Sequence, residues 1–250
     1  MLPNYSDTGP GAGALFQYTL SRFIQGADAN PFQQGAVTQT VPRHGQPLQR
    51  RRGGFASVLI QRMFTMALKA TIYKAQLQLT DMDRNVYADH NVIIARHPSE
   101  TDERMMIRLL AFALNVPADD KQGNLEFAKD LWDVDEPALW HKDYTEQIRQ
   151  WIDVGQPDDK RLMRAAGRAE RVTAYSFSSS TPVWWKAIET KLTRAANLVV
   201  WQIEAAESQA LAKLAERSMQ LQVTVQDGSV WMSTALGSVD ITPRRLTASS

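Results

Sequence analysis

The residues of this chain with the clearest capacity for chemistry are acidic, and they fall in its second half. Glu103 lies in the first turn of an expected helix, Asp135 and Glu136 form an acidic corner, and Asp153 lies within an apolar run. Side chains alternate along a strand, so Asp153 points away from its apolar neighbours, and a carboxylate there is costly unless it is paired or bound to a metal. If the three positions converge, they predict an oxygen-rich site for Mg²⁺ or Mn²⁺, which could activate water for phosphodiester cleavage.

Each of these carboxylates also has a purely structural interpretation. Glu103 could stabilise the dipole of its helix, the acidic corner could be a plain turn, and Asp153 could pair with Lys160 or Arg161. Other site chemistries are disfavoured. The chain has no cysteine, which excludes disulfides and thiolate metal sites. Its four histidines lie in unrelated contexts, and no nucleophile-elbow, zinc-protease or dinucleotide-binding motif is present.

The charges divide the 250 residues into two unlike segments, although the formal net charge is only +1. Residues 1–65 contain six arginines, no lysine, two aspartates and no glutamate, which gives +4, and eight of the 13 glycines; residues 66–250 therefore carry −3. We expect 1–65 to be a disordered extension rich in Gly, Pro and Arg, and Met66 is a candidate for the true start. We expect 66–250 to be one domain. No run of about 18 apolar residues is present, so no membrane span is predicted.

The elements that would position the acids alternate between strands and helices. Alternation predicts strands at 68–79 and 86–96, and Ser99 is the expected N-cap of a helix over 100–115. A short strand is expected within 125–132, before the acidic corner. The remaining expectations are strands at 148–154, 172–177 and 197–203, helices at 159–169, 182–195 and 207–217, and a final hairpin turning at Asp227–Gly228. This order predicts the mixed α/β class.

Several stretches in this order resemble the YaeQ family of bacterial proteins. They include MALKATIYKA at 66–75, ARHPSETDERMMIRLLAFAL at 95–114, DEPALW at 135–140, WIDVGQPDDKR at 151–161 and QDGSVWMS at 226–233. The resemblance covers about 180 residues, and nothing before residue 66 takes part in it.

The resemblance implies a mixed sheet flanked by helices, with a core like that of the PD-(D/E)XK restriction endonucleases. It gives Glu103 the role of the helix acid, Asp135 or Glu136 that of the central acid, and Asp153 that of the first acid of the (D/E)-X-K element. Glu103, Asp135 and Asp153 would be the metal ligands. Gly155 stands where that pattern requires lysine; Gln156 could partly substitute for it, and Lys160 could reach back from the next helix.

Two functions follow as expectations. The first is a metal-dependent phosphodiesterase that acts on nucleic acid, without an organic cofactor, with phosphate contacts from Lys160, Arg161, Arg164 and Arg168. The alternative is a non-catalytic module that kept the nuclease fold and binds nucleic acid or protein. Gly155 and the Trp-rich second half favour the alternative, since tryptophan is frequent at binding hot spots, although tryptophans more often fill a core. A cytoplasmic location is expected for either.

Overall fold

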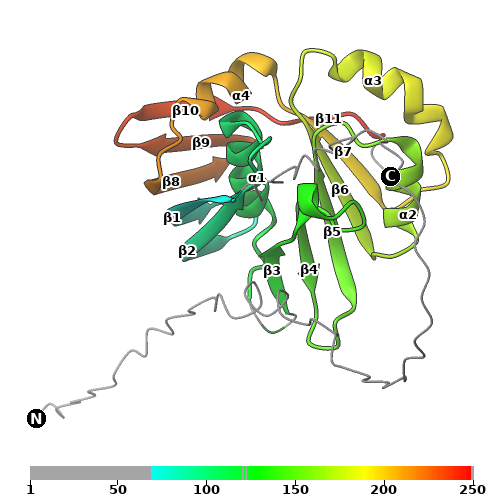
Figure 1. Ribbon diagram of the computed structural model, residues 1–250, viewed down its shortest axis with the longest axis horizontal. Coiled ribbons are helices and arrows are strands. Elements are labelled where there is room, and N and C mark those ends of the chain that lie inside the picture. Colours follow the sequence, from blue (N-terminus) through cyan, green and yellow to red (C-terminus); the bar gives the residue numbers. More distant parts are fainter. Residues whose placement is uncertain (1–68, 120, 122, 249–250) are drawn as a thin grey trace, which may run out of the picture. The chain divides into compact units, whose positions relative to one another are not determined.

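The first sheet joins strands from the two ends of the described chain. The computed structural model describes residues 69–119, 121 and 123–248, so the predicted extension lies outside the described residues. β1 (Thr71–Asp81) and β2 (Val86–Arg96) form an antiparallel hairpin, and β1 also pairs in parallel with β8 (Ser218–Gln226). β9 (Ser229–Thr234) and β10 (Gly237–Ile241) complete the order β10-β9-β8-β1-β2 (Figure 1). Alternate residues of β1 and β8 are buried, so one face of this sheet covers the core.

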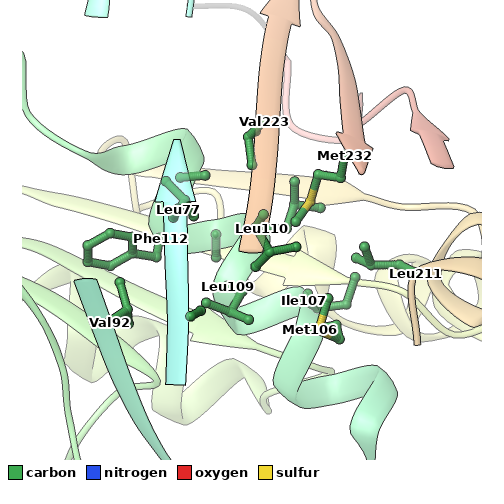
Figure 2. Packing of buried hydrophobic residues seen from close by; sticks show 14 of the residues in the cluster. Leu77, Val92, Met106, Ile107, Leu109, Leu110, Phe112, Leu211, Val223 and Met232 are labelled. Carbon is green, nitrogen blue, oxygen red and sulfur yellow. The ribbon is translucent and has the colours of Figure 1, made fainter. Parts of the chain in front are cut away.

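The helix α1 (Asp102–Asn115) is buried on all sides rather than along one stripe. Every residue from Met105 to Ala113 is buried, as expected of an apolar helix enclosed by the fold. Leu109 and Leu110 of α1 pack with Leu77 of β1 and Val223 of β8 (Figure 2). The helix begins two residues later than the sequence suggested: Thr101, not Ser99, is the N-cap, and its hydroxyl accepts a hydrogen bond from the Arg104 amide.

The second sheet contains the predicted site strands and has the order β11-β7-β6-β5-β4-β3. Its strands are β3 (Asn124–Phe127), β4 (Leu139–Lys142), β5 (Ile148–Val154), β6 (Arg171–Ser176), β7 (Leu198–Gln202) and β11 (Arg244–Arg245). β4 pairs antiparallel with both β3 and β5, whereas β5, β6 and β7 are parallel. The strand expected within 125–132 ends at Phe127, and a 3-10 helix, η2 (Asp130–Trp132), follows it; Asp130, its first residue, has a positive φ of 49°.

The remaining helices connect the parallel strands and the two sheets. They are α2 (Asp159–Ala166), α3 (Thr181–Ile188), the 3-10 helix η3 (Glu189–Lys191) and α4 (Ala205–Ala212). α2 and α3 contribute to a second apolar cluster that includes Trp151, Leu162 and Val172. Trp184 and Trp185 are half-buried against that cluster, whereas Trp231 is exposed on β9. Within the described residues, no helix has the length and apolar character needed to cross a membrane.

Candidate functional site

The two faces of β5 are covered by different helices, and this separates the predicted acids. Ile152 and Val154 belong to the core cluster that contains α1, whereas Trp151 belongs to the cluster that contains α2. Asp153 shares the Trp151 face, since strand side chains alternate. Glu103, on α1, therefore lies on the opposite side of the sheet from the Asp153 side chain.

Asp153 is buried and its partner is an arginine of α2. The Asp153 side chain is 4% exposed and that of Arg161 is 20% exposed. Arg161 Nη2 lies 2.8 Å from Asp153 Oδ1, and Arg161 Nε lies 3.1 Å from Oδ2, so both carboxylate oxygens accept from one guanidinium. This arrangement is the fork-to-fork geometry in which arginine–carboxylate pairs are strongest. Of the two roles expected for Arg161, a phosphate contact or a partner of Asp153, the structure shows the pair with Asp153.

Arg161 also binds the backbone of the loop that carries the acidic corner. Its Nη1 donates to the Val134 carbonyl at 2.5 Å and its Nη2 to the Glu136 carbonyl at 2.8 Å. Burial alone would lower the pKa of Arg161, but the hydrogen bond and charge of Asp153, with the charges of Asp130 and Asp158, raise the pKa above its usual value. The guanidinium is therefore a permanent cation at this position.

The other predicted acids have separate partners. Glu103 Oε1 accepts a hydrogen bond of 2.5 Å from the Ser208 hydroxyl of α4. Asp135 is exposed, with its carboxylate 3.4 Å from Arg164 Nη1. Glu136 accepts from the Lys129 amide at 2.9 Å and lies 3.3 Å from the Lys129 ammonium group.

The lysine position of the nuclease pattern has a backbone that disfavours lysine. Gly155 has φ of 111°, a left-handed conformation that side chains rarely adopt, and its amide donates to the Tyr175 carbonyl at 2.8 Å. Gln156 does not face the carboxylates but exchanges hydrogen bonds with the Ser180 hydroxyl at 3.0 and 3.2 Å. Lys160 is exposed on α2 and forms no ion pair with any residue of the described ranges.

A buried ion network that the sequence analysis did not find lies beside the Asp153 pair. The Glu100 carboxylate is fully buried and accepts from Arg104 Nη1 at 2.9 Å and from Arg108 Nη1 at 3.0 Å. Arg104 Nη2 lies 2.6 Å from Asp130 Oδ2, without the alignment of a hydrogen bond, and it also donates to the Val154 carbonyl at 3.1 Å. The signal was present in the sequence: Glu100, Arg104 and Arg108 are spaced four apart, and Arg108 interrupts an apolar helix.

These contacts do not fit the divalent cation that the resemblance implies. Both oxygens of Asp153 already face a guanidinium, and Glu103 lies across the sheet and bonds to Ser208. Among residues 69–119, 121 and 123–248, no three His, Asp or Glu side chains are grouped so as to hold a metal ion. Arginines, rather than an arrangement of open carboxylates, balance the buried acids Glu100 and Asp153.

The fold and the site together define a mixed α/β protein with two sheets, whose buried acids are paired with arginines. The family model described as "YaeQ protein" matches residues 66–243, and the chain belongs to the YaeQ family. The match begins where the composition of the chain changes, and it includes Glu100, Asp130 and Asp153.

Relatives and solved structures agree with this assignment. Proteins described as "Uncharacterized protein YaeQ" from Salmonella typhi and Escherichia coli K12 are each 41% identical to the chain, over 177 and 169 residues. These alignments cover 70% and 67% of this chain and 95% and 91% of the relatives. The crystal structure of YaeQ from Xanthomonas axonopodis pv. citri is 44% identical, with a TM-score of 0.67, and covers 72% of this chain and 99% of that one. The YaeQ structure from Pseudomonas syringae is 36% identical, also with a TM-score of 0.67, over 72% of this chain and 97% of that one.

Proposed function

We propose that the protein is a non-catalytic interaction module built on a nuclease-like core, and that it binds a protein partner through the loop 131–134. The observation that carries this proposal is the Asp153–Arg161 pair. A guanidinium 2.8 Å from Asp153 Oδ1 supplies the positive charge that a divalent cation would supply in a nuclease. The same guanidinium holds the carbonyls of Val134 and Glu136, so the pair positions the loop.

The order of elements supports the nuclease-like core. α1 is followed by the antiparallel strands β3, β4 and β5, then by α2, and then by β6 in parallel with β5. This is the helix, three strands, helix and strand that the resemblance implies. Gly155 and the inward-facing Arg161 support a core that binds rather than cleaves, because neither a catalytic lysine nor an open carboxylate remains on β5.

The loop 131–134 has the character of a protein-binding surface. Leu131 and Trp132 are each 44% exposed and Val134 is 76% exposed, which places three apolar side chains in water on one short segment. The loop is anchored by Arg161 at Val134 and by Arg104 at Asp130, so little conformational freedom remains to be lost on binding. Tryptophan is enriched among the residues that dominate interface energies.

Nucleic acid is the less favoured partner because two of the four basic residues expected to contact phosphate are paired with acids. Arg161 is paired with Asp153, Arg164 lies 3.4 Å from Asp135, and the Arg168 guanidinium lies 5.4 Å from the centre of the Trp151 ring. Strong phosphate binding requires several free cations along one face. Of the predicted phosphate contacts, Lys160 and Arg168 are exposed without an ion pair to a described residue, and two cations are few for strong phosphate binding.

The test compares two exposed tryptophans. Trp132→Ala removes the centre of the proposed surface, and Trp231→Ala removes a tryptophan of similar exposure, 40%, on β9. We expect cross-linking in cells of a related bacterium, followed by mass spectrometry, to give one dominant protein adduct that Trp132→Ala abolishes and Trp231→Ala retains. Reconstitution with that purified protein should reproduce the loss. Equal adducts from both variants would contradict the protein-binding proposal.

A second measurement addresses catalysis directly. Calorimetric titration of the full chain with Mg²⁺ and Mn²⁺, together with cleavage assays on single- and double-stranded DNA and RNA, should give no stoichiometric binding and no cleavage. Stoichiometric metal binding and cleavage that Asp153→Asn abolishes would overturn the proposal and favour the phosphodiesterase.

A further inference from the structure

A cavity lies at the end of β5 away from Asp153, where no site residue was predicted. Its volume is about 580 Å³, within the range of roughly 300–1,000 Å³ typical of small-molecule sites. The turn after β1, the end of α1 and the first residues of β5 and β6 surround it. Its lining contains three arginines (Arg84, Arg149, Arg171), two acids (Asp119, Glu170) and the polar residues Asn115, His141 and Gln150.

The wall of the cavity is built from a buried polar network. Gln150 Nε2 donates to Asn115 Oδ1 at 2.6 Å and to the Thr173 hydroxyl at 3.1 Å. Asn115 Nδ2 donates in turn to the Tyr175 hydroxyl at 2.8 Å and to the Ala111 carbonyl at 2.7 Å. Gln150, Thr173 and Tyr175 are all buried. Polar side chains at such positions are costly unless they are hydrogen-bonded, and here their bonds fix the orientation of the Gln150 amide.

That amide holds an arginine that forms no ion pair with a carboxylate of the described residues. Arg171 Nη2 donates to Gln150 Oε1 at 2.7 Å, and Arg171 forms no ion pair within the described part of the chain. The other two arginines of the lining differ. Arg84 is paired with Asp81 at 2.7 Å and donates to two carbonyls at the end of α1, and Arg149 is paired with Asp143 at 3.0 Å and with Glu170.

The lining therefore combines one exposed guanidinium that has no ion pair to a described residue with neutral amide groups, two arginines that are already paired, and two acids, of which Glu170 is paired with Arg149 and Asp119 accepts from the Lys121 amide. The guanidinium has five N–H donors in a planar fork, and the bond to Gln150 uses one of its nitrogens while leaving the others available. A fork held in place by a neutral amide matches the geometry of a carboxylate or phosphate, which it can contact through two parallel hydrogen bonds.

We propose that this cavity binds a small organic anion through its carboxylate or phosphate group, with Arg171 as the charged partner of that group. Gln150 is a positioning residue, because it acts on the bound anion through the Arg171 guanidinium that it orients. The volume of the cavity matches that of sites for small molecules. The site lies apart from the loop 131–134 and does not depend on the function proposed for that loop.

The experiment titrates the full-length protein with inorganic phosphate and, separately, with acetate at constant ionic strength, followed by NMR. The two probes distinguish phosphate from carboxylate recognition. We expect saturable shifts centred on Arg171, Asn115 and His141 with at least one probe. Arg171→Gln should weaken that binding about tenfold or more, and Arg171→Lys should give an intermediate loss because it keeps the charge but not the fork.

Arg194→Gln is the matched control, because Arg194 is exposed elsewhere on the domain. It should bind each probe as the unmodified protein does. The shift map of the unmodified protein is independent of whether any variant folds. Saturable shifts centred away from the cavity, equal binding by Arg171→Gln, or no saturable binding of either probe would each overturn the proposal.

Discussion

Replacing Asp153 by asparagine tests whether the buried pair with Arg161 is a structural cation–carboxylate pair. The change removes one charge and keeps the shape, leaving a guanidinium that is 20% exposed without its partner. Breaking a buried pair in this way typically costs about 3–5 kcal/mol. Arg161 keeps its bonds to the Val134 and Glu136 carbonyls and has some access to water, so we expect the lower end, about 3 kcal/mol. For a domain of this size, that loss corresponds to a fall in Tm of roughly 6–12 °C.

The assay is thermal and urea unfolding of the two proteins, with and without Mg²⁺. Asp135→Asn is the control, because Asp135 also faces an arginine but is 63% exposed, and its loss should cost less than about 1 kcal/mol. A double-mutant cycle with Arg161→Gln should give a double variant that loses less than the sum of the single variants. The reasoning is refuted if Asp153→Asn is as stable as the unmodified protein without metal, or if Mg²⁺ stabilises the unmodified protein and not the variant. Either result would indicate that Asp153 belongs to a cluster of repelling acids that binds a cation.

Three further changes test other parts of the fold. Burial raises the pKa of Tyr175 to about 12, against about 10 for an unfolded chain. As the pH rises, the unfolded state therefore loses its proton first, and the free energy of unfolding should fall between about pH 10 and 12. Urea unfolding across this range should show a smaller fall for Tyr175→Phe, and an unchanged slope would contradict the burial argument. Gly123→Ala should lower the free energy of unfolding by more than about 2 kcal/mol, because the new Cβ would lie 1.9 Å from the Lys142 carbonyl oxygen. Gly228→Ala is the control: its Cβ would have no atom within 4 Å, and it should lower the free energy of unfolding by about 1 kcal/mol. Equal unfolding free energies for the two variants would be inconsistent with the clash. A protein that starts at Met66, where the family match begins, should have the same melting temperature as the full chain. A fall in the free energy of unfolding well beyond the roughly 0.5 kcal/mol typical of surface changes would show that the preceding residues stabilise the domain.

The sequence predicted those elements in which the pattern of apolar residues follows directly from which faces are buried. The strands at 86–96 and 148–154 and the turn at Asp227–Gly228 are confirmed. The helices expected at 159–169, 182–195 and 207–217 end early, at Ala166, Ile188 and Ala212, because local turns replace their last residues. The strands β4, β10 and β11 were missed, since all three are short.

The arrangement of the site was less accessible to sequence reasoning, for a reason of geometry. Alternation correctly placed Asp153 opposite Ile152 and Val154, and pairing with Arg161 was one of the alternatives considered. Which helix covers which face of β5 is a tertiary property, however, and it decides that Glu103 and Asp153 point to different sides. The Glu100–Arg104–Arg108 spacing was readable, but its burial depends on sheets that are distant in sequence.

The parallel pairing of β1 with β8 has a consequence for how the protein is made. Lys74 pairs with Ser218, so the first described strand has no partner on that edge until nearly the whole domain has left the ribosome. At typical rates of synthesis this interval is on the order of ten seconds. During that time the hairpin of β1 and β2 exposes an unpaired edge and an apolar face that includes Leu77 and Ile94, both buried in the finished fold. Until the C-terminal strands arrive, the nascent chain therefore carries an edge and an apolar face of the kind that promote aggregation.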